Sequence, residues 1–141
     1  MTDESLEDLA ARAVHSSAEA AEAILDTMGD LPPFGIAFFA DGKRQLVAPF
    51  EEAKTAEQAA HEWLRSQVAK QLEAVVRQRD DVVAVTTILA DDGPAKVYIQ
   101  LETRAALVLP FAFPITVRDG KRDLEEPHVF DQLIAAPIFP R

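Results

Sequence analysis

The sequence predicts an α+β fold in which two long helices pack on an antiparallel sheet of about five strands. Two stretches, residues 5–28 and 55–79, repeat apolar side chains at helical spacing. Residues 81–117 hold the longest runs of strand-forming residues, separated by turn signals. The predicted order is α-β-β-α-β-β-β, followed by an extended C-terminal tail. A chain of 141 residues without a linker or repeat is expected to form a single domain, residues 1–141.

Residues 5–28 are predicted to form an amphipathic helix. Ser5 with Asp8 resembles a capping box, and Gly29 with two prolines shortly after it is a stop signal. The apolar face consists largely of alanine, which suits a close packing contact but buries little area per residue. The pair Ser16-Ser17 is expected to be a weak point in the middle of this helix.

Residues 34–40 and 45–50 are predicted to form the two strands of a hairpin. The pair Asp41-Gly42 is the best turn signal in the chain and indicates a two-residue loop. In the first strand Phe34, Ile36 and Phe38 point to one side, and the residues between them are also apolar. Both faces of this strand are therefore expected to be partly covered.

The second helix is predicted over residues 55–79, where Thr55 with Gln58 makes a capping box. A helix of this length spans about 37 Å, which is enough to cross several strands. Trp63, Leu72 and Val76 belong to its apolar stripe, and we expect these three side chains to pack onto the sheet.

Three further strands are predicted in residues 82–89, 97–101 and 105–117. In the middle one, apolar and polar residues alternate, which indicates one dry and one mostly wet face. Pro110 and Pro114 share a parity in the last one, so both remove N–H donors along the same edge. The late part of that strand is therefore expected at a sheet edge or next to a bulge. Asp119-Gly120 is a second turn signal, and residues 124–141 are predicted to be mostly extended, with at most a helical turn around 130–135.

The composition excludes several classes of partner. The formal net charge is −10 and the isoelectric point is near 4.6. No basic patch could displace phosphate counterions, so nucleic acid and anionic membranes are not expected partners. The chain has no cysteine, which excludes a disulfide frame or a thiolate site. No basic leader with an apolar core and no membrane-length apolar run is visible, so a soluble cytoplasmic protein is expected by default.

No constellation for catalysis or metal binding rises above background. The segment His61-Glu62-Trp63-Leu64-Arg65 resembles the start of a zinc-protease helix, but that motif needs a second histidine where Arg65 stands. The other two histidines lie on different predicted elements. The glycines form no phosphate-binding pattern, and no serine lies in a nucleophile elbow. No metal, cofactor or catalytic residue is therefore predicted, and a noncatalytic protein is favoured over an enzyme.

Two candidate binding surfaces remain. The polar strand face after residue 96 could hold a small polar ligand or form an ordinary solvated face with cross-strand pairs. Its side chains are Tyr98, Gln100, Glu102 and Arg104. The C-terminal third carries an apolar surplus that would form an interface patch where it is exposed. Its residues are Phe111, Phe113, Ile115, Phe130, Ile138 and Phe139. The alternative is that the tail folds back over the sheet and completes the core, and both can hold in a dimer.

Several short motifs accompany the order of elements. They are Phe34-Gly35, Asp41-Gly42, Leu109-Pro110-Phe111, the basic turn Asp119-Gly120-Lys121-Arg122, and Ala136-Pro137-Ile138-Phe139. This combination resembles small uncharacterised bacterial α+β proteins with a domain of unknown function. By element order alone, the chain is similar to roadblock and profilin-like modules, and more loosely to acidic secretion chaperones. The roadblock and profilin resemblance implies a noncatalytic dimerising scaffold whose last strand is central.

The sequence therefore favours a noncatalytic binding or assembly module of bacterial type that forms a homodimer or binds another protein. The alternative is a small-ligand-binding or enzymatic domain that uses the polar strand face.

Overall fold

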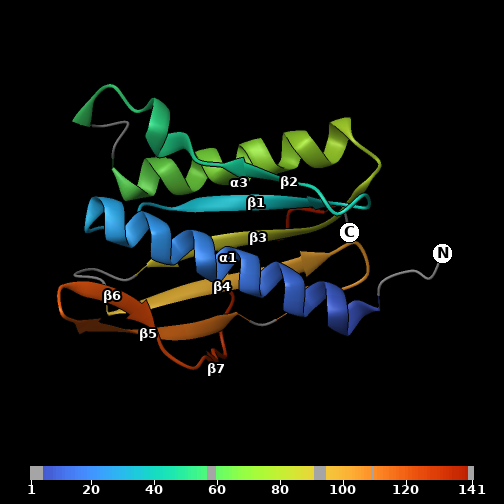
Figure 1. The fold of residues 1–141 in the computed structure, drawn as a ribbon. Coiled ribbons are helices and arrows are strands. Elements are labelled where there is room, and N and C mark those ends of the chain that lie inside the picture. Colours follow the sequence, from blue (N-terminus) through green and yellow to red (C-terminus); the bar gives the residue numbers. More distant parts are fainter. Residues whose placement is uncertain (1–4, 57–59, 91–94, 109, 140–141) are drawn as a thin grey trace.

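The computed structural model describes residues 5–56, 60–90, 95–108 and 110–139. Figure 1 shows the helices and strands, coloured along the sequence from the N-terminus to the C-terminus. Their bounds are α1 Leu6–Met28, β1 Phe34–Phe39, β2 Arg44–Val47, the 3-10 helix η1 Pro49–Glu52, α3 His61–Gln78, β3 Val82–Ala90, β4 Lys96–Thr103, β5 Phe111–Arg118, β6 Lys121–Leu124 and β7 His128–Val129. The predicted turn at 91–94 and the Gln58 half of the capping box lie outside the described residues.

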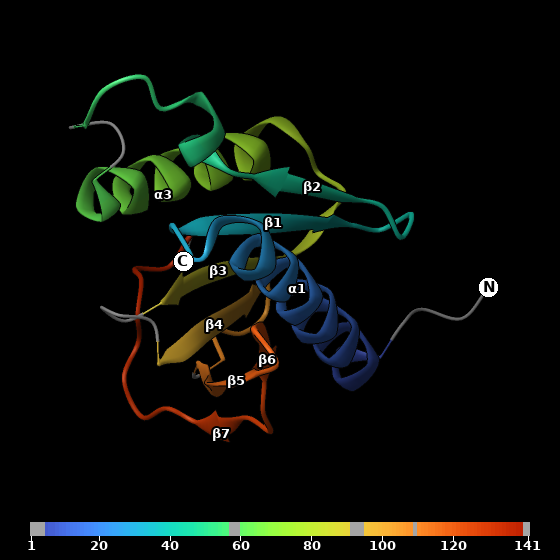
Figure 2. The same cartoon turned by 60° about the vertical axis from the view of Figure 1, so that its left-hand side comes forward.

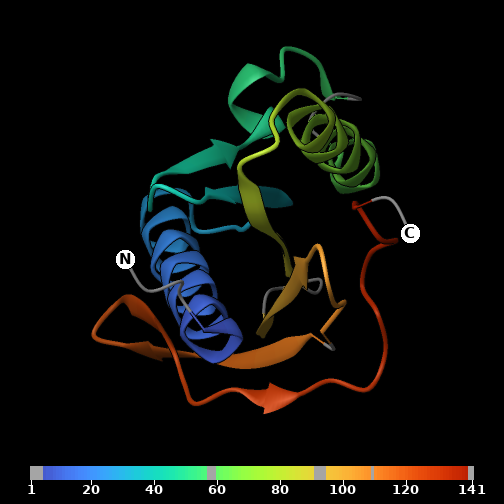
Figure 3. The same ribbon diagram turned by 90° about the vertical axis from the view of Figure 1, so that its right-hand side faces the viewer.

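The described strands form one antiparallel sheet that curls around α1. The strand order is β2-β1-β3-β4-β5-β6, and β7 pairs with β5 beside β6. In Figure 3 the sheet is seen end-on, with α1 in its hollow and α3 on the opposite face. This confirms the α+β class, the antiparallel sheet and its two helices. Among the described residues the sheet has seven strands rather than about five, because residues 121–124 and 128–129 also pair.

Helix α1 has the ends that the sequence indicates. The Ser5 side chain accepts a hydrogen bond from the backbone N–H of Asp8, and Gly29 ends the helix with a left-handed φ of 73°. Ala13, Ala21 and Leu25 are fully buried against the hollow face of the sheet. The mostly alanine face lets the helix lie close to β3 and β4, as expected from its small side chains.

The two hairpins have different loops. Between β1 and β2, the N–H of Phe39 bonds the Lys43 carbonyl, so three residues, 40–42, form the loop. The predicted two-residue loop at Asp41-Gly42 is therefore wrong. The chain instead uses a turn whose last residue, Gly42, has a left-handed φ of 89°. Between β5 and β6, Asp119 and Gly120 form a two-residue loop, and both have positive φ.

Helix α3 begins later than predicted. The backbone of Ala60 is extended, at φ −65° and ψ 134°, so the helix starts at His61 and not at residue 55. The buried stripe follows the i, i+4 spacing and consists of Leu64, Val68, Leu72 and Val76. Leu72 and Val76 thus pack on the sheet as expected. Trp63 precedes the stripe by one position and is only half-buried.

Strand β5 as a whole lies inside the sheet, but its late part, predicted at an edge or next to a bulge, has one neighbour in the described ladders, because residues 115–118 pair with β6 alone. Strand β5 pairs with β4 on one side and with β6 and β7 on the other. The carbonyls of Pro110 and Pro114 both accept hydrogen bonds on the β6–β7 side, from Phe130 and Glu125. Pro114 lies where the neighbour changes from β6 to β7, so its missing donor falls at a break in the ladder.

Residues 130–139 form the C-terminal segment. It leaves β7, passes over the face of the sheet opposite α1 and ends beside α3 (Figures 2 and 3). The segment contains no described helix or strand, in line with the predicted extended tail. Ile138 and Phe139 are buried in a second core between the sheet and α3, together with residues such as Phe39, Val68 and Leu72. The first core lies between the sheet and α1.

Candidate functional site

The polar strand face of β4 is covered by the C-terminal segment. Tyr98, Gln100 and Glu102 alternate with Val97, Ile99 and Leu101, which face α1 in the first core. The predicted wet face is therefore largely dry. Gln100 is only 3% exposed and Glu102 only 2% exposed. Their polar atoms must be satisfied by the protein, because burial without a partner is costly.

Gln100 makes hydrogen bonds to the backbone of the C-terminal segment. Its side-chain oxygen accepts from the N–H groups of Ile134 at 2.8 Å and Ala135 at 3.3 Å. Its side-chain nitrogen donates to the carbonyl of Ala135 at 2.9 Å. Both ends of one amide thus bind main-chain groups, so the contact does not depend on which side chains residues 134 and 135 carry.

Glu102 binds the end of the same segment. One carboxylate oxygen accepts from the N–H of Ile138 at 2.7 Å, and the other accepts from the N–H of Phe139 at 2.8 Å. Hydrogen bonds from two N–H donors to one buried carboxylate are strong, because they are charge-assisted. They place the side chains of Ile138 and Phe139 in the second core.

Three further contacts hold the segment. The Arg104 guanidinium lies over the Phe139 ring at 5.0 Å, and the rings of Tyr98 and Phe130 are 5.0 Å apart. From α3, Arg65 donates to the carbonyl of Ile134 at 3.0 Å. All four predicted polar residues therefore contact the C-terminal segment. The role of Arg65 was not predicted, because nothing local relates α3 to a carbonyl 69 residues later.

The six predicted interface residues are divided between the two faces of the sheet. Ile138 and Phe139 are buried in the second core, and Phe113 is buried in the first. Phe111 and Ile115 are partly buried on the α1 side, while Phe130 packs on Tyr98. The tail therefore folds back at its end, and Phe111 with Phe113 remains beside open space.

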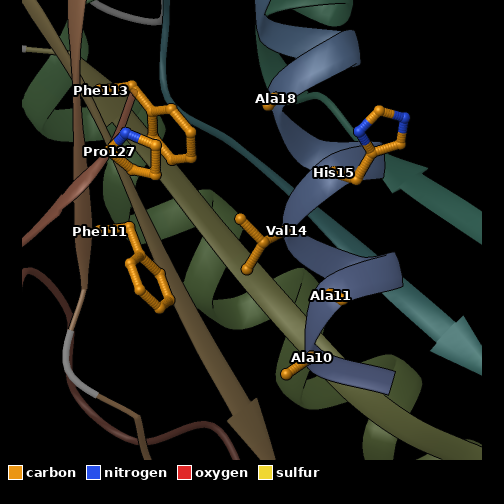
Figure 4. Close-up of a pocket in the computed structure, with 8 residues that line it drawn as sticks. All are labelled: Ala10, Ala11, Val14, His15, Ala18, Phe111, Phe113 and Pro127. Carbon is orange, nitrogen blue, oxygen red and sulfur yellow. The ribbon is translucent and has the colours of Figure 1, made fainter. Parts of the chain in front are cut away.

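That open space is a groove between α1 and β5, which we call the α1–β5 groove. Its volume is about 350 Å³. It is lined by Ala10, Ala11, Val14, His15 and Ala18 of α1 and by Phe111, Phe113 and Pro127. In Figure 4, Val14 and Ala10 lie on the wall facing the two phenylalanines, whereas the His15 ring turns away from them. The walls are therefore almost entirely apolar.

Beyond the groove, α1 is bound to β6. Glu22 accepts a hydrogen bond from the backbone N–H of Leu124 at 3.0 Å, and Asp26 accepts one from the backbone N–H of Arg122 at 3.4 Å, so β6 holds the C-terminal half of the helix. In the N-terminal half, short alanine side chains face β5 and leave the space between them unfilled.

The α1 wall of the groove is flanked by acidic residues. Glu7 and Asp8 precede the lining residues by about a turn, and Glu19 follows them. All three are exposed. On the opposite wall, exposed Glu126 is next to Pro127. The groove thus combines an apolar floor with negative flanks.

The histidines do not form a site in the part of the chain that the structure describes. His15 pairs with Glu19 at 2.8 Å on α1, and His61 lies 3.3 Å from Asp30. His128 lies exposed on β7. Among the described residues, no group of three or more His, Asp or Glu side chains could hold a metal ion.

One ion pair has shifted pKa values. Arg79 donates two hydrogen bonds to the Asp81 carboxylate, at 3.0 and 2.7 Å, which lowers the pKa of Asp81 and raises that of Arg79. Both side chains are partly solvated, and the Arg79 guanidinium also lies 4.0 Å from the centre of the Phe39 ring. This pair joins the end of α3 to the start of β3.

Comparison with known proteins gives no assignment. No family model, no curated protein and no solved structure matches this chain. Among the described helices, none is long and apolar enough to cross a membrane.

Proposed function

We propose that the protein is a noncatalytic binding module whose α1–β5 groove accepts the apolar side chains of a protein partner. The observation that carries this proposal is the groove itself: about 350 Å³ between α1 and β5, with Val14, Phe111 and Phe113 on its walls. A space of this size is within the range of specific pockets and suits a few aliphatic or aromatic side chains.

The flanking charges define the chemistry of the partner. Glu7, Asp8 and Glu19 on one side and Glu126 on the other favour lysine and arginine residues around an apolar centre. An amphipathic helix with a basic rim has this composition. A second copy of this chain is a poor occupant of the groove, because its own net charge of −10 would meet these acidic flanks.

The polar strand face supports the alternative, a small-ligand or enzymatic domain, less well. Gln100 and Glu102 use their side-chain atoms to bind the C-terminal segment, so a ligand would have to compete with it. A hollow of about 340 Å³ remains beside Arg65, Tyr98 and Phe130, but the other described residues that line it are apolar.

The proposal is tested with a synthetic amphipathic helix made of leucine and lysine. Titration into the ¹⁵N-labelled protein should produce saturable shifts at Val14 and Phe111, weaker at high salt because the flanking charges are screened. Val14→Asp should abolish the shifts, while Leu46→Asp, at an exposed apolar residue on β2, should leave them unchanged. A matched leucine–glutamate helix should not bind. Equal binding of both helices, or binding that Val14→Asp leaves intact, would show that the groove is not the site.

A further inference from the structure

The C-terminal segment is held in the way that a binding protein holds a peptide. Gln100 and Glu102 bind its main-chain groups, Arg65 binds one of its carbonyls, and Arg104 covers its terminal aromatic ring. We call the cleft formed by these side chains of β4 and α3 the segment cleft. We propose that the segment cleft also accepts the C-terminal segment of a second copy of this chain, so that two copies exchange these segments reciprocally.

The way in which the segment is attached favours release. The last described ladder before it is the two-residue pairing of β7 with β5, followed by one bond from the N–H of Phe130 to Pro110. Beyond Phe130, the hydrogen bonds that hold the described part of the segment come from side chains of β4 and α3, and not from the backbone of a neighbouring strand. Releasing it therefore leaves the β3–β4 and β4–β5 ladders intact.

The joint for the exchange lies at residues 131–133. All three are exposed, and Leu133 remains 48% exposed although it is apolar. Every contact made within one copy can be remade between two copies, so the exchange changes only the conformation of this joint. That equivalence is why a second copy is the occupant with the best demonstrated fit.

The short joint fixes which surfaces meet. Three extended residues reach at most roughly 10 Å, so the two segment clefts must face each other closely. The dimer therefore forms on the α3 face of the sheet. The α1–β5 groove lies on the other face and stays open in both copies. The exchange is thus independent of the function proposed for the groove.

Two full-length variants test the exchange by complementation. Glu102→Ala damages the cleft and leaves the segment intact, whereas Phe139→Ala damages the segment and leaves the cleft intact. The natural protein should contain a species of twice the 15.5 kDa chain mass in sedimentation velocity. Each variant damages the same contact within one copy and between two copies, so neither alone should change the fraction of dimer. An equimolar mixture should contain more mixed dimer than random pairing gives, because one cleft and segment are then both intact and the second damage to the other pair adds little. The control is a mixture of two differently labelled Glu102→Ala samples, which should pair at random.

A natural protein that stays at the monomer mass overturns the proposal, and so does a mixed dimer that is no more abundant than in the control. Circular dichroism checks that both variants fold. If either does not, Gln100→Ala and Ile134→Pro replace them, because these remove cleft-to-backbone hydrogen bonds without emptying the second core. None of the four positions lines the α1–β5 groove, so failure here leaves the groove proposal standing.

Discussion

The hydroxyls of Ser17 on α1 and Thr86 on β3 are 2.7 Å apart and form a buried hydrogen bond across the first core. Both residues are fully buried. The middle of α1, expected from its serines to be weak, is thus attached to a central strand. This bond fixes the position of the helix along β3, because apolar packing alone is not directional.

Ser17→Ala should lower the free energy of unfolding by about 1 kcal/mol, because it leaves the Thr86 hydroxyl buried without its partner. Thr86→Val should have a similar cost. The double variant should cost less than the sum of the two, since both polar groups are then gone. Urea denaturation of the four proteins measures this difference. Additive costs would mean that the two hydroxyls do not depend on each other.

A second close contact lies on the other face, where α3 crosses β1 at Gly35. A Cβ atom at this position would lie 2.8 Å from a methyl of Leu72 and 3.0 Å from the Thr86 carbonyl oxygen. Gly35→Ala should therefore lower the free energy of unfolding by about 1–3 kcal/mol, as overpacking in a core does. It should also speed amide hydrogen exchange at Leu72, because the helix must move outward.

Gly42→Ala is the matched control for this effect. Nothing lies within 4 Å of a Cβ at that position, and the cost arises only from its φ of 89°. The variant should be destabilised without faster exchange in α3. If Gly35→Ala leaves both stability and exchange unchanged, α3 does not pack closely at this point.

The elements that the sequence predicts well have local signals. The Ser5 cap, the Gly29 stop and the apolar runs of β3 and β4 depend on neighbouring residues alone. The strand residues of β6 and β7 carry no such signal, although the Asp119-Gly120 turn marks the loop before β6. Lys121–Leu124 is mostly polar and His128–Val129 is exposed, and both pair only because β5 is already in place. The start of α3 was misplaced for a related reason, since the extended backbone at Ala60 is not marked by proline or glycine.

The sequence identifies the residues of the candidate site but not how they are arranged. The alternation of Tyr98, Gln100 and Glu102 with apolar residues marks a polar face, but it does not show what covers that face. Polar side chains on a solvated strand and polar side chains that bind buried main chain have the same sequence pattern. The segment that covers them lies more than thirty residues later. The sequence shows the alanine-rich face of α1. It does not show the groove, because the groove depends on the distance between that face and β5.

Glu102→Ala should lower the free energy of unfolding by about 3 kcal/mol, because two buried N–H groups, of Ile138 and Phe139, lose a charged acceptor. Glu102→Gln should cost less, since the amide oxygen can still accept one of the two bonds. Glu126→Gln, at an exposed carboxylate, should change the stability by less than about 0.5 kcal/mol. Chemical denaturation checks all three. A loss in Glu102→Ala no larger than that in Glu126→Gln would mean that the segment is not held by this carboxylate.

The Arg79–Asp81 pair should make stability depend on pH in the acid range. Because the hydrogen bond from Arg79 lowers the pKa of Asp81 from its ordinary value of 3.8, the folded state favours the ionised carboxylate. The pair therefore stabilises the fold fully at pH values above 3.8, and this contribution is lost as the pH falls through the lowered pKa of the folded state. The effect is expected to be small, since the side chains are partly exposed.

Asp81→Asn should accordingly be less stable than the natural protein at pH 6 and equally stable once the pH lies below the lowered pKa of Asp81 in the folded state. Asp80→Asn is the control, because Asp80 is the exposed neighbour and its side chain makes no such bond with Arg79. Urea denaturation of the three proteins at both pH values distinguishes the stability contributed by the Arg79–Asp81 pair from the general destabilisation by acid. If the difference between Asp81→Asn and the natural protein persists at low pH, it does not come from the charge of Asp81.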